Sequence, residues 1–368
     1  MNIVKEDYRL RELRNIETMI ENSGKLYIWG FSQTAKMITA FLKRNSNLKI
    51  EGYIVDDAYY EQTKTDEGNV YCASAWKNLA QEGDYVIFGF VGSERAEKIK
   101  KSLPTGVLGV YFSFPYSANV DGFYITADYY NQFEERFLET YDCLYDEASK
   151  KIMAAFLNGC ISGDTRALER LKTEGQYFNE LTKECKSGSF LDLGAYTGDT
   201  IESAFEFLGN RVEKVYAFEP DHKNIELLRN RISARQIPER RWELIPKGSW
   251  SHEAVLHFSS SDSSSSISEK GDMEIKVDSV DRVLLETDKP VAFIKMDVEG
   301  SELESLQGAA KTIQENYPIL AVCVYHKPED LYTLPEMIKS LTAGRDYHFY
   351  LRYHGPDLRE LVFYAIPE

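Results

Sequence analysis

Cysteine is scarce in this sequence of 368 residues, and no two of its five cysteines form a C-x-x-C pair. Their odd number and scattered positions argue against a disulfide framework and against a zinc site. Long apolar runs are also lacking, since the longest, residues 319–325, is far too short to cross a bilayer. The first residues, MNIVKEDYR, lack the apolar core of a signal peptide. We therefore expect a cytoplasmic protein with reduced thiols and no membrane span.

Positive charge is in deficit as well. Lysine and arginine number 43 against 59 aspartates and glutamates, which gives a net charge of −16. Such a chain is poorly suited to gripping a nucleic-acid backbone or an anionic membrane. The balance favours a cationic or neutral small ligand, and aromatic residues, at 13%, suit aromatic-lined pockets or interfaces. The composition carries no indication of an oligomeric state.

Apolar runs and helical periodicities divide the chain into three regions, residues 1–119, 120–187 and 188–368. The first begins with a strand, helix, strand and further strand, at 25–30, 33–44, 49–55 and 84–89. This order predicts an N-terminal Rossmann-like lobe. The second region predicts a helical connector, with helices at 132–144 and 147–158, a stop at Gly159 and a helix begun by Asp164.

The third region alternates strands and helices. Strands are expected at 189–193, 212–218, 242–245, 291–296 and 319–325, and helices at 200–207, 224–233, 302–313 and 334–341. The two last strands, 347–353 and 361–366, are expected to form an antiparallel pair. The fold class is therefore α/β, with a C-terminal Rossmann-like sheet that is mostly parallel and carries a terminal antiparallel hairpin.

The sequence FLDLGAYTGDT, at 190–200, stands where a strand turns into a helix. Gly194 and Gly198 would let the backbone approach a ligand, but their spacing differs from the G-x-G-x-x-G of dinucleotide sites. Asp192 and Asp199 flank the loop and would repel a pyrophosphate. S-adenosylmethionine has no phosphate and carries a sulfonium and an ammonium group. We therefore predict this cofactor, with Asp192 accepting from the ammonium and backbone N–H groups near Thr200 holding the carboxylate.

A second carboxylate follows the next strand. Glu219 ends the strand in the sequence AFEP, 27 residues after Asp192, where it can accept hydrogen bonds from ribose hydroxyls. The alternative is an exposed carboxylate that caps the following helix, because Pro220 comes immediately after it.

A third carboxylate, Asp297, lies in the sequence FIKMDVEGSE at 293–302. A strand would deliver it to the carboxyl edge of the sheet. Methyl transfer requires an acceptor atom held in line with the sulfonium, and a base if the acceptor is a hydroxyl. Asp297 is our candidate for holding or deprotonating the acceptor. Alternatively, Asp297 and Glu299 cap the next helix.

His326 follows the strand at 319–325, at the same edge of the sheet as Asp297. A histidine that titrates near neutral pH there would serve as the base, or it would be a structural hydrogen-bonding group. Asp297, Glu299 and His326 are a conceivable ligand set. However, no H-x-x-x-H pattern or cysteine cluster accompanies them, so we predict no metal.

These motifs resemble the FkbM family of S-adenosylmethionine-dependent methyltransferases. The resemblance rests on DLGAYTGDT at 192–200, FEP at 218–220, IKMDVEG at 294–300 and YHKPEDL at 325–331, and it extends over about half of the chain, from residue 176 to the C-terminus. It implies a class I methyltransferase sheet and usually O-methylation, often of sugars or natural products. The cofactor-binding residues predicted from these motifs are Asp192, Gly194, Ala195, Tyr196, Thr197, Gly198, Asp199, Thr200, Glu219 and Pro220.

Two further segments have open roles. Lys247 and Gly248 follow the strand at 242–245 and would touch adenine, or they form a tight turn with Trp250 in the core. The serine-rich segment 259–266 is a substrate lid or a plain connection.

The N-terminal lobe has one loop glycine, Gly30, and an acid, Asp56, at the end of its second strand. Its possible roles are to bind a nucleotide-sugar or to dock a partner. Alternatively, it is a lobe whose cofactor site has been lost, or it has a purely structural role. Our leading interpretation is a methyltransferase acting on a hydroxyl of a saccharide or another sugar-linked small molecule. The rivals are a nucleotide-sugar-binding or NAD-dependent oxidoreductase working through the lobe, and a non-catalytic docking protein that binds the cofactor.

Overall fold

The structure is a computed structural model, and it describes residues 1–20, 24–62, 68–115, 124–258, 273–285 and 290–368. The chain divides into two compact units. The first contains residues 1–134, 152–172 and 355–359, and the second contains residues 135–151, 173–354 and 360–368. Within the described ranges, none of the helices combines the length and the apolar character that crossing a membrane requires. The serine-rich segment 259–266 lies outside the described residues.

The first unit contains a five-stranded parallel sheet in the order β3-β2-β1-β4-β5. Its strands are β1 (Leu26–Trp29), β2 (Ile50–Val55), β3 (Asn69–Cys72), β4 (Tyr85–Phe88) and β5 (Leu108–Tyr111). All residues of β1 and β4 are buried, as their uninterrupted apolar runs predict for central parallel strands. The unit also contains α1 (Tyr8–Ile20), α2 (Gln33–Asn45), η1 (Asp57–Gln62), α3 (Ala73–Leu79), α4 (Ser93–Lys100), α5 (Ala127–Gln132) and α8 (Arg166–Glu169).

Helices α6 (Glu134–Cys143) and α7 (Glu147–Ser162) occupy the predicted helical connector. Helix α7 continues through Gly159, where the sequence predicts its end. A Cβ atom on Gly159 would lie 2.8 Å from a methyl carbon of Leu358, so this glycine makes room for packing rather than ending the helix. The helix ends just before Gly163, whose φ of +76° is a left-handed conformation typical of helix ends.

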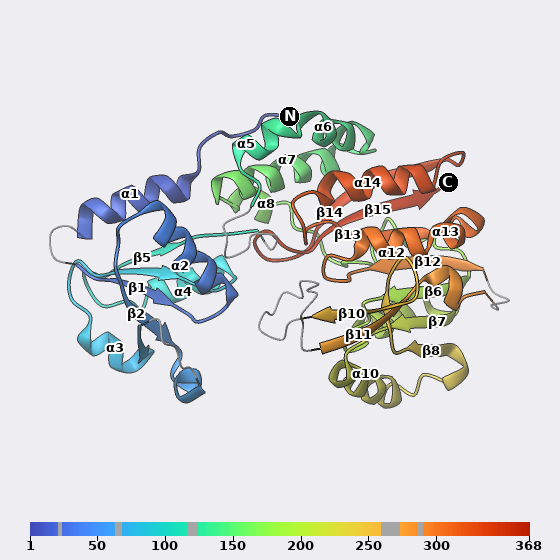
Figure 1. Cartoon of the computed structure of the whole chain (residues 1–368), viewed down its shortest axis with the longest axis horizontal. Coiled ribbons are helices and arrows are strands. Elements are labelled where there is room, and N and C mark those ends of the chain that lie inside the picture. Colours follow the sequence, from blue (N-terminus) through green and yellow to red (C-terminus); the bar gives the residue numbers. More distant parts are fainter. Residues whose placement is uncertain (21–23, 63–67, 116–123, 259–272, 286–289) are drawn as a thin grey trace. The chain divides into compact units, whose positions relative to one another are not determined.

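The second unit contains a seven-stranded sheet in the order β14-β15-β13-β12-β6-β7-β8, which Figure 1 shows strand by strand. Its strands are β6 (Gly188–Leu193), β7 (Val212–Phe218), β8 (Trp242–Ile245), β12 (Val291–Met296), β13 (Ile319–Cys323), β14 (Tyr347–Tyr353) and β15 (Leu361–Pro367). Five strands are parallel, and β14 and β15 form an antiparallel pair at one edge. The predicted fold class is confirmed.

Helices α9 (Asp199–Leu208) and α10 (His222–Ala234) pack against each other, as do α12 (Glu302–Gly308), α13 (Ala310–Asn316) and α14 (Asp330–Leu341). The first residue of α10 is preceded by Asp221, whose carboxylate accepts from two N–H groups of the first turn. The single helix predicted at 302–313 is broken into α12 and α13. A Cβ atom on Gly308 would lie 1.9 Å from the carbonyl oxygen of Trp250, so Gly308 admits this carbonyl at the break.

A small three-stranded sheet that the sequence did not indicate completes this unit. It contains β9 (Gly248–Ser249), β10 (Ala254–Phe258) and β11 (Met273–Asp278), and the short helices α11 (Val280–Val283), η2 (Gly209–Arg211) and η3 (Glu239–Arg241) lie elsewhere in the unit. In the main core, the rings of Phe178, Phe190 and Phe293 pack with centroids 5.4–5.7 Å apart. This packing ties the segment before β6 to the centre of the sheet.

Candidate active site

The loop between β6 and α9 is the predicted cofactor loop, and it packs against the end of β12. Gly194 and Gly198 have φ values of +83° and +82°, a region that favours glycine. A Cβ atom on Gly194 would lie 1.9 Å from the carbonyl oxygen of Asp297, so no larger residue fits there without a shift. The structure therefore places the predicted cofactor loop directly beside the predicted acceptor residue.

Asp192 is fully buried on β6 and forms an ion pair with Lys295, the residue opposite it on β12. The distance from Nζ of Lys295 to Oδ1 of Asp192 is 3.1 Å, and Nζ also donates to the carbonyl of Gly194 at 2.5 Å. Burial raises the pKa of Asp192 to about 6, although Lys295 opposes the shift. Burial alone would lower the pKa of Lys295, but Asp192 and Asp297 outweigh it and raise the pKa.

This ion pair changes the electrostatic argument drawn from the sequence. The two loop acids were expected to act together against a phosphate, but the charge of Asp192 is matched by a lysine that the motif analysis did not consider. Asp199, at the start of α9, is exposed. The repulsion therefore rests mainly on Asp199, while the Asp192–Lys295 pair fixes the backbone of the cofactor loop.

Glu219 joins the cofactor loop to the end of β7. Its Oε2 accepts from the backbone N–H of Tyr196 at 2.9 Å, and its Oε1 accepts from the N–H of Asp221 at 2.9 Å and from the side chain of Asn224 at 3.3 Å. The side chain is largely buried, and burial is the main reason that its pKa is raised. Because Asp221 caps α10, the capping alternative for Glu219 is not the arrangement found.

We expect Glu219→Gln to weaken S-adenosylmethionine binding by roughly 10- to 100-fold, because a hydrogen bond to a charged group contributes about 1.5–3 kcal/mol. Isothermal titration calorimetry on the full chain measures the change. Glu226→Gln is the matched control, since Glu226 is exposed on the neighbouring helix α10. Equal affinities for the two variants would contradict the ribose-binding role.

The other predicted cofactor residues surround this loop. Ala195 and Thr200 are buried, whereas Tyr196 is exposed, and Thr197 accepts a hydrogen bond from Arg231 at 3.4 Å. Gly198 is the residue before α9, and a Cβ atom there would lie 3.1 Å from Leu228 of α10. The loop is thus held between β7, β12 and α10.

Lys247 and Gly248 lie at the start of the small sheet. A Cβ atom on Gly248 would lie 3.9 Å from the ring of Pro220, so this glycine is near the end of β7. The Nζ of Lys247 lies 2.7 Å from Asp278 and 3.4 Å from Glu253. Burial would raise the pKa of Asp278, but hydrogen bonds from Arg282 and Lys247 lower it to about 2. Lys247 is therefore engaged in an ion-pair network, and Trp250 is half-buried rather than part of the core.

Asp297 follows β12 and contacts two side chains from distant parts of the sequence. Its Oδ2 accepts from the hydroxyl of Tyr177 at 3.0 Å, and its Oδ1 lies 3.4 Å from Nε2 of His326. The residue that directly precedes α12 is Ser301, so Asp297 does not occupy the position of the helix cap. Next to Asp297, Glu299 and Gly300 have φ values of 54° and 95°, which turn the chain back toward α12.

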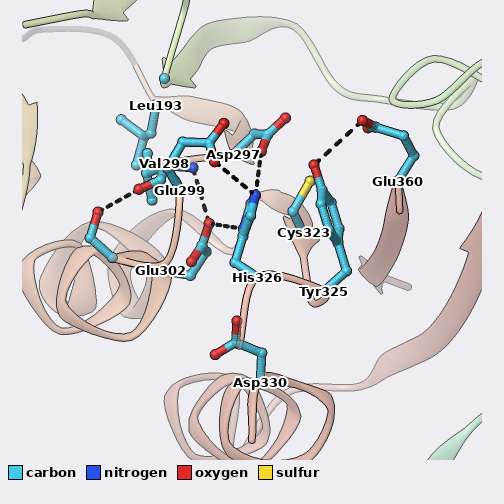
Figure 2. Close-up of polar contacts among 12 residues, drawn as sticks. Leu193, Asp297, Val298, Glu299, Glu302, Cys323, Tyr325, His326, Asp330 and Glu360 are labelled. Atoms are coloured by element: carbon cyan, nitrogen blue, oxygen red, sulfur yellow. Dashed lines mark hydrogen bonds and ion pairs between the residues drawn. The ribbon is translucent and has the colours of Figure 1, made fainter. Parts of the chain in front are cut away.

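His326 is surrounded by carboxylates, as Figure 2 shows. Its Nδ1 lies 2.8 Å from Oε1 of Glu302, and its Nε2 lies 3.7 Å from Oε2 of Glu299. Burial alone would lower its pKa, but Glu302, Asp297 and Glu299 raise it to about 10. The sequence alone predicts titration near neutral pH. With this pKa the imidazole is protonated at neutral pH and cannot accept a proton as it stands.

A cavity of about 450 Å³ opens beside the cofactor loop. One side is the start of α9, and the other is the segment before β6 that contains Tyr177. Its lining includes the side chains of Gln176, Phe178, Thr200, Ser203 and Phe207. Tyr177 also lines the cavity, which combines aromatic and hydroxyl groups with the acidic residues Asp199 and Glu206.

Three functional candidates were missed by the sequence analysis, namely Tyr177, Lys295 and Glu302. Lys295 had a visible signal, because a lysine in the apolar strand VAFIKM needs a buried partner. The sequence signal for Glu302 was weaker, because the sequence indicates only that this residue begins a helix. Tyr177 had none, because it lies 120 residues from Asp297, a distance along the chain that only the fold closes.

In the first unit, Asp56 is the acid on which the oxidoreductase alternative depends. Its carboxylate lies 2.6 Å from Arg95 and accepts from the indole N–H of Trp29 at 3.3 Å.

Comparison with known proteins gives a matching domain model and a fold. Residues 192–349 match the methyltransferase FkbM domain. The crystal structure of methyltransferase FkbM from Methylobacillus flagellatus KT superposes with a TM-score of 0.70 and 22% identity, covering 95% of this chain and 93% of that one. This likeness shows that the fold is shared over both units. A search among curated proteins found no match.

Two other structures are similar over about half of the chain. The rRNA methylase of Streptococcus thermophilus has 15% identity and a TM-score of 0.32, covering 51% of this chain and 92% of that one. Fibrillarin from Aeropyrum pernix, with natively bound S-adenosyl-L-methionine, has 13% identity and a TM-score of 0.33, covering 50% and 67%.

Proposed function

Since residues 192–349 match the methyltransferase FkbM domain, we propose that the chain methylates a hydroxyl oxygen of a saccharide or sugar-linked metabolite. The observation that carries the proposal is the contact between Gly194 and the backbone of Asp297. It brings the cofactor loop and a carboxylate able to hold a hydroxyl to one point of the sheet edge.

The side chains present fit the cofactor. Glu219, a largely buried carboxylate beside the loop, suits the ribose hydroxyls, and Asp192 is the predicted partner of the ammonium group. When bound, S-adenosylmethionine supplies an electrophilic methyl carbon on a sulfonium. Asp297 then orients the acceptor hydroxyl or accepts its proton, and Tyr177 holds the second oxygen of Asp297 in place.

The protonated form of His326 leaves Asp297 as the better candidate for the proton acceptor. His326 then acts on Asp297 through the contact at Oδ1. Hydroxyl-bearing acceptors suit the neighbouring cavity, since its lining includes Ser203 together with Phe178 and Phe207.

The proposal is tested by incubating the full chain with S-adenosylmethionine that carries an isotope-labelled methyl group and with a panel of saccharides and sugar-linked metabolites. We expect labelled product with hydroxylated acceptors and a methyl resonance typical of an ether. Label found only on nitrogen, or only on acceptors without a sugar, would contradict the proposed substrate class while leaving the methyltransferase assignment intact.

A further inference from the structure

The side chains of Asp297, Glu302 and His326 form a compact group that we call the acid–histidine cluster. One potential ligand atom from each lies within 4.8 Å of the other two. Glu302 and His326 are almost fully buried, and Asp297 is partly exposed. An imidazole nitrogen combined with carboxylate oxygens is a donor set that first-row divalent metals accept.

The ring of His326 is held in the orientation that a metal ligand requires. Glu302 lies 2.8 Å from Nδ1, and Oε1 of Glu302 is itself fixed by the backbone N–H of Val298 at 3.0 Å. The other ring nitrogen, Nε2, faces Asp297 and the more exposed Glu299 (Figure 2). Metal-binding histidines commonly donate their second N–H to a carboxylate in this way.

The separations on the Nε2 side match a coordination shell better than hydrogen bonds. Nε2 lies 3.4 Å from Oδ1 of Asp297 and 3.7 Å from Oε2 of Glu299. Hydrogen bonds of this kind span about 2.7–3.2 Å. Two ligands about 2.1 Å from one ion, at tetrahedral or octahedral angles, lie roughly 3.0–3.4 Å apart. The separation between Nε2 and Oδ1 of Asp297 lies within that range, and a small movement of the Glu299 side chain would bring Oε2 into it.

The oxygens of the cluster provide a second observation. Oδ1 of Asp297 and Oε2 of the buried Glu302 have no hydrogen-bond partner in the part of the chain that the structure describes. Buried anionic oxygens without hydrogen bonds are costly unless a positive charge lies close to them. In the ion-free protein the imidazolium of His326 faces Oδ1 of Asp297, and a divalent ion bound at Nε2 would displace the ring proton and supply the charge in its place.

We propose that the acid–histidine cluster binds a divalent transition-metal ion through Nε2 of His326 and Oδ1 of Asp297, with Glu299 as a third ligand on the exposed side. Glu302 holds the histidine ring from behind. The ion lies beside the cofactor loop, because Gly194 packs against the backbone of Asp297. Its role, to bind the acceptor hydroxyl, rests on the proposed function, whereas the binding itself does not.

Calorimetric titration of chelator-treated full-length protein with Mn²⁺, and separately with Zn²⁺, tests the site. We expect one ion per chain in the wild type. Asp297→Asn and Glu299→Gln should each weaken binding by roughly 10- to 100-fold, the range seen when residues that support a metal site are changed. Glu299 is largely exposed, so its variant should fold normally. Glu315→Gln, on the surface of α13, is the matched control.

Two results would overturn the inference: no saturable binding of either ion to the wild type, or equal affinity in the Asp297→Asn/Glu299→Gln double variant. Cofactor binding and methyl transfer are measured on the same samples. If these persist without metal binding, the inference fails and the proposed function stands. If the metal binds but no methyl transfer occurs with any acceptor, the proposed function fails and the metal site remains.

Discussion

Asp297→Asn is expected to reduce turnover by roughly 10²- to 10⁴-fold, the range for loss of a group that transfers or positions a proton. The amide has nearly the shape of the carboxylate, and its oxygen can still accept from Tyr177. It has no negative charge with which to accept a proton or to face His326. Affinity for S-adenosylmethionine should stay unchanged, because the cofactor loop contacts the backbone of Asp297 and not its side chain.

This expectation is checked by steady-state methyl transfer, with an acceptor found in the screen described above, and by calorimetry with the cofactor. Asp346→Asn, at an exposed position, is the matched control. Full turnover in Asp297→Asn would exclude a direct part for this carboxylate. A parallel loss of cofactor affinity would instead indicate that the substitution had disturbed the loop.

Lys295→Met should lower the free energy of unfolding of the second unit by about 3–5 kcal/mol, since it leaves the buried carboxylate of Asp192 without a counter-charge. The double variant Asp192→Val/Lys295→Met should recover most of this loss, because apolar residues often replace a buried ion pair without a stability cost. Urea denaturation of four proteins, namely the wild type, Asp192→Val, Lys295→Met and the double variant, measures the coupling between the two sites.

The same double variant separates two roles of Asp192. If its carboxylate binds the ammonium group of the cofactor, as the sequence predicts, the double variant should be stable. Its affinity for S-adenosylmethionine should nevertheless be lower than that of the wild type. Binding at wild-type strength would restrict Asp192 to holding the loop. A double variant as unstable as Lys295→Met would show that the pair is not the source of the stability change.

The sequence predicts the central strands of the main sheet well because β6, β12 and β13 are almost wholly buried, mainly apolar runs. The run VAFIKM, for example, corresponds to β12 with unchanged bounds. Breaks in helices are harder to predict. The division between α12 and α13 depends on the carbonyl of Trp250, more than fifty residues earlier, and nothing local to Gly308 reveals it. The small sheet was missed for a related reason, because β9 has only two residues and is defined by its pairing with β11.

The site shows the same limit. Loop glycines and strand-end acids follow a recognisable pattern, so Gly194, Glu219 and Asp297 could be named from the sequence. Their electrostatic state could not, because it depends on partners brought in by the fold. Lys295 balances Asp192 across two strands, and Glu302 and Glu299 set the protonation of His326.

The division of the chain between the two units limits which recombinant fragments contain the whole candidate active site. The unit with the candidate active site is assembled from three separate stretches, residues 135–151, 173–354 and 360–368. A recombinant fragment beginning at residue 188 would therefore omit Tyr177 and the stretch 135–151. We therefore expect such a fragment to transfer methyl groups less well than the intact polypeptide, so deletion mapping would understate what the C-terminal half contributes.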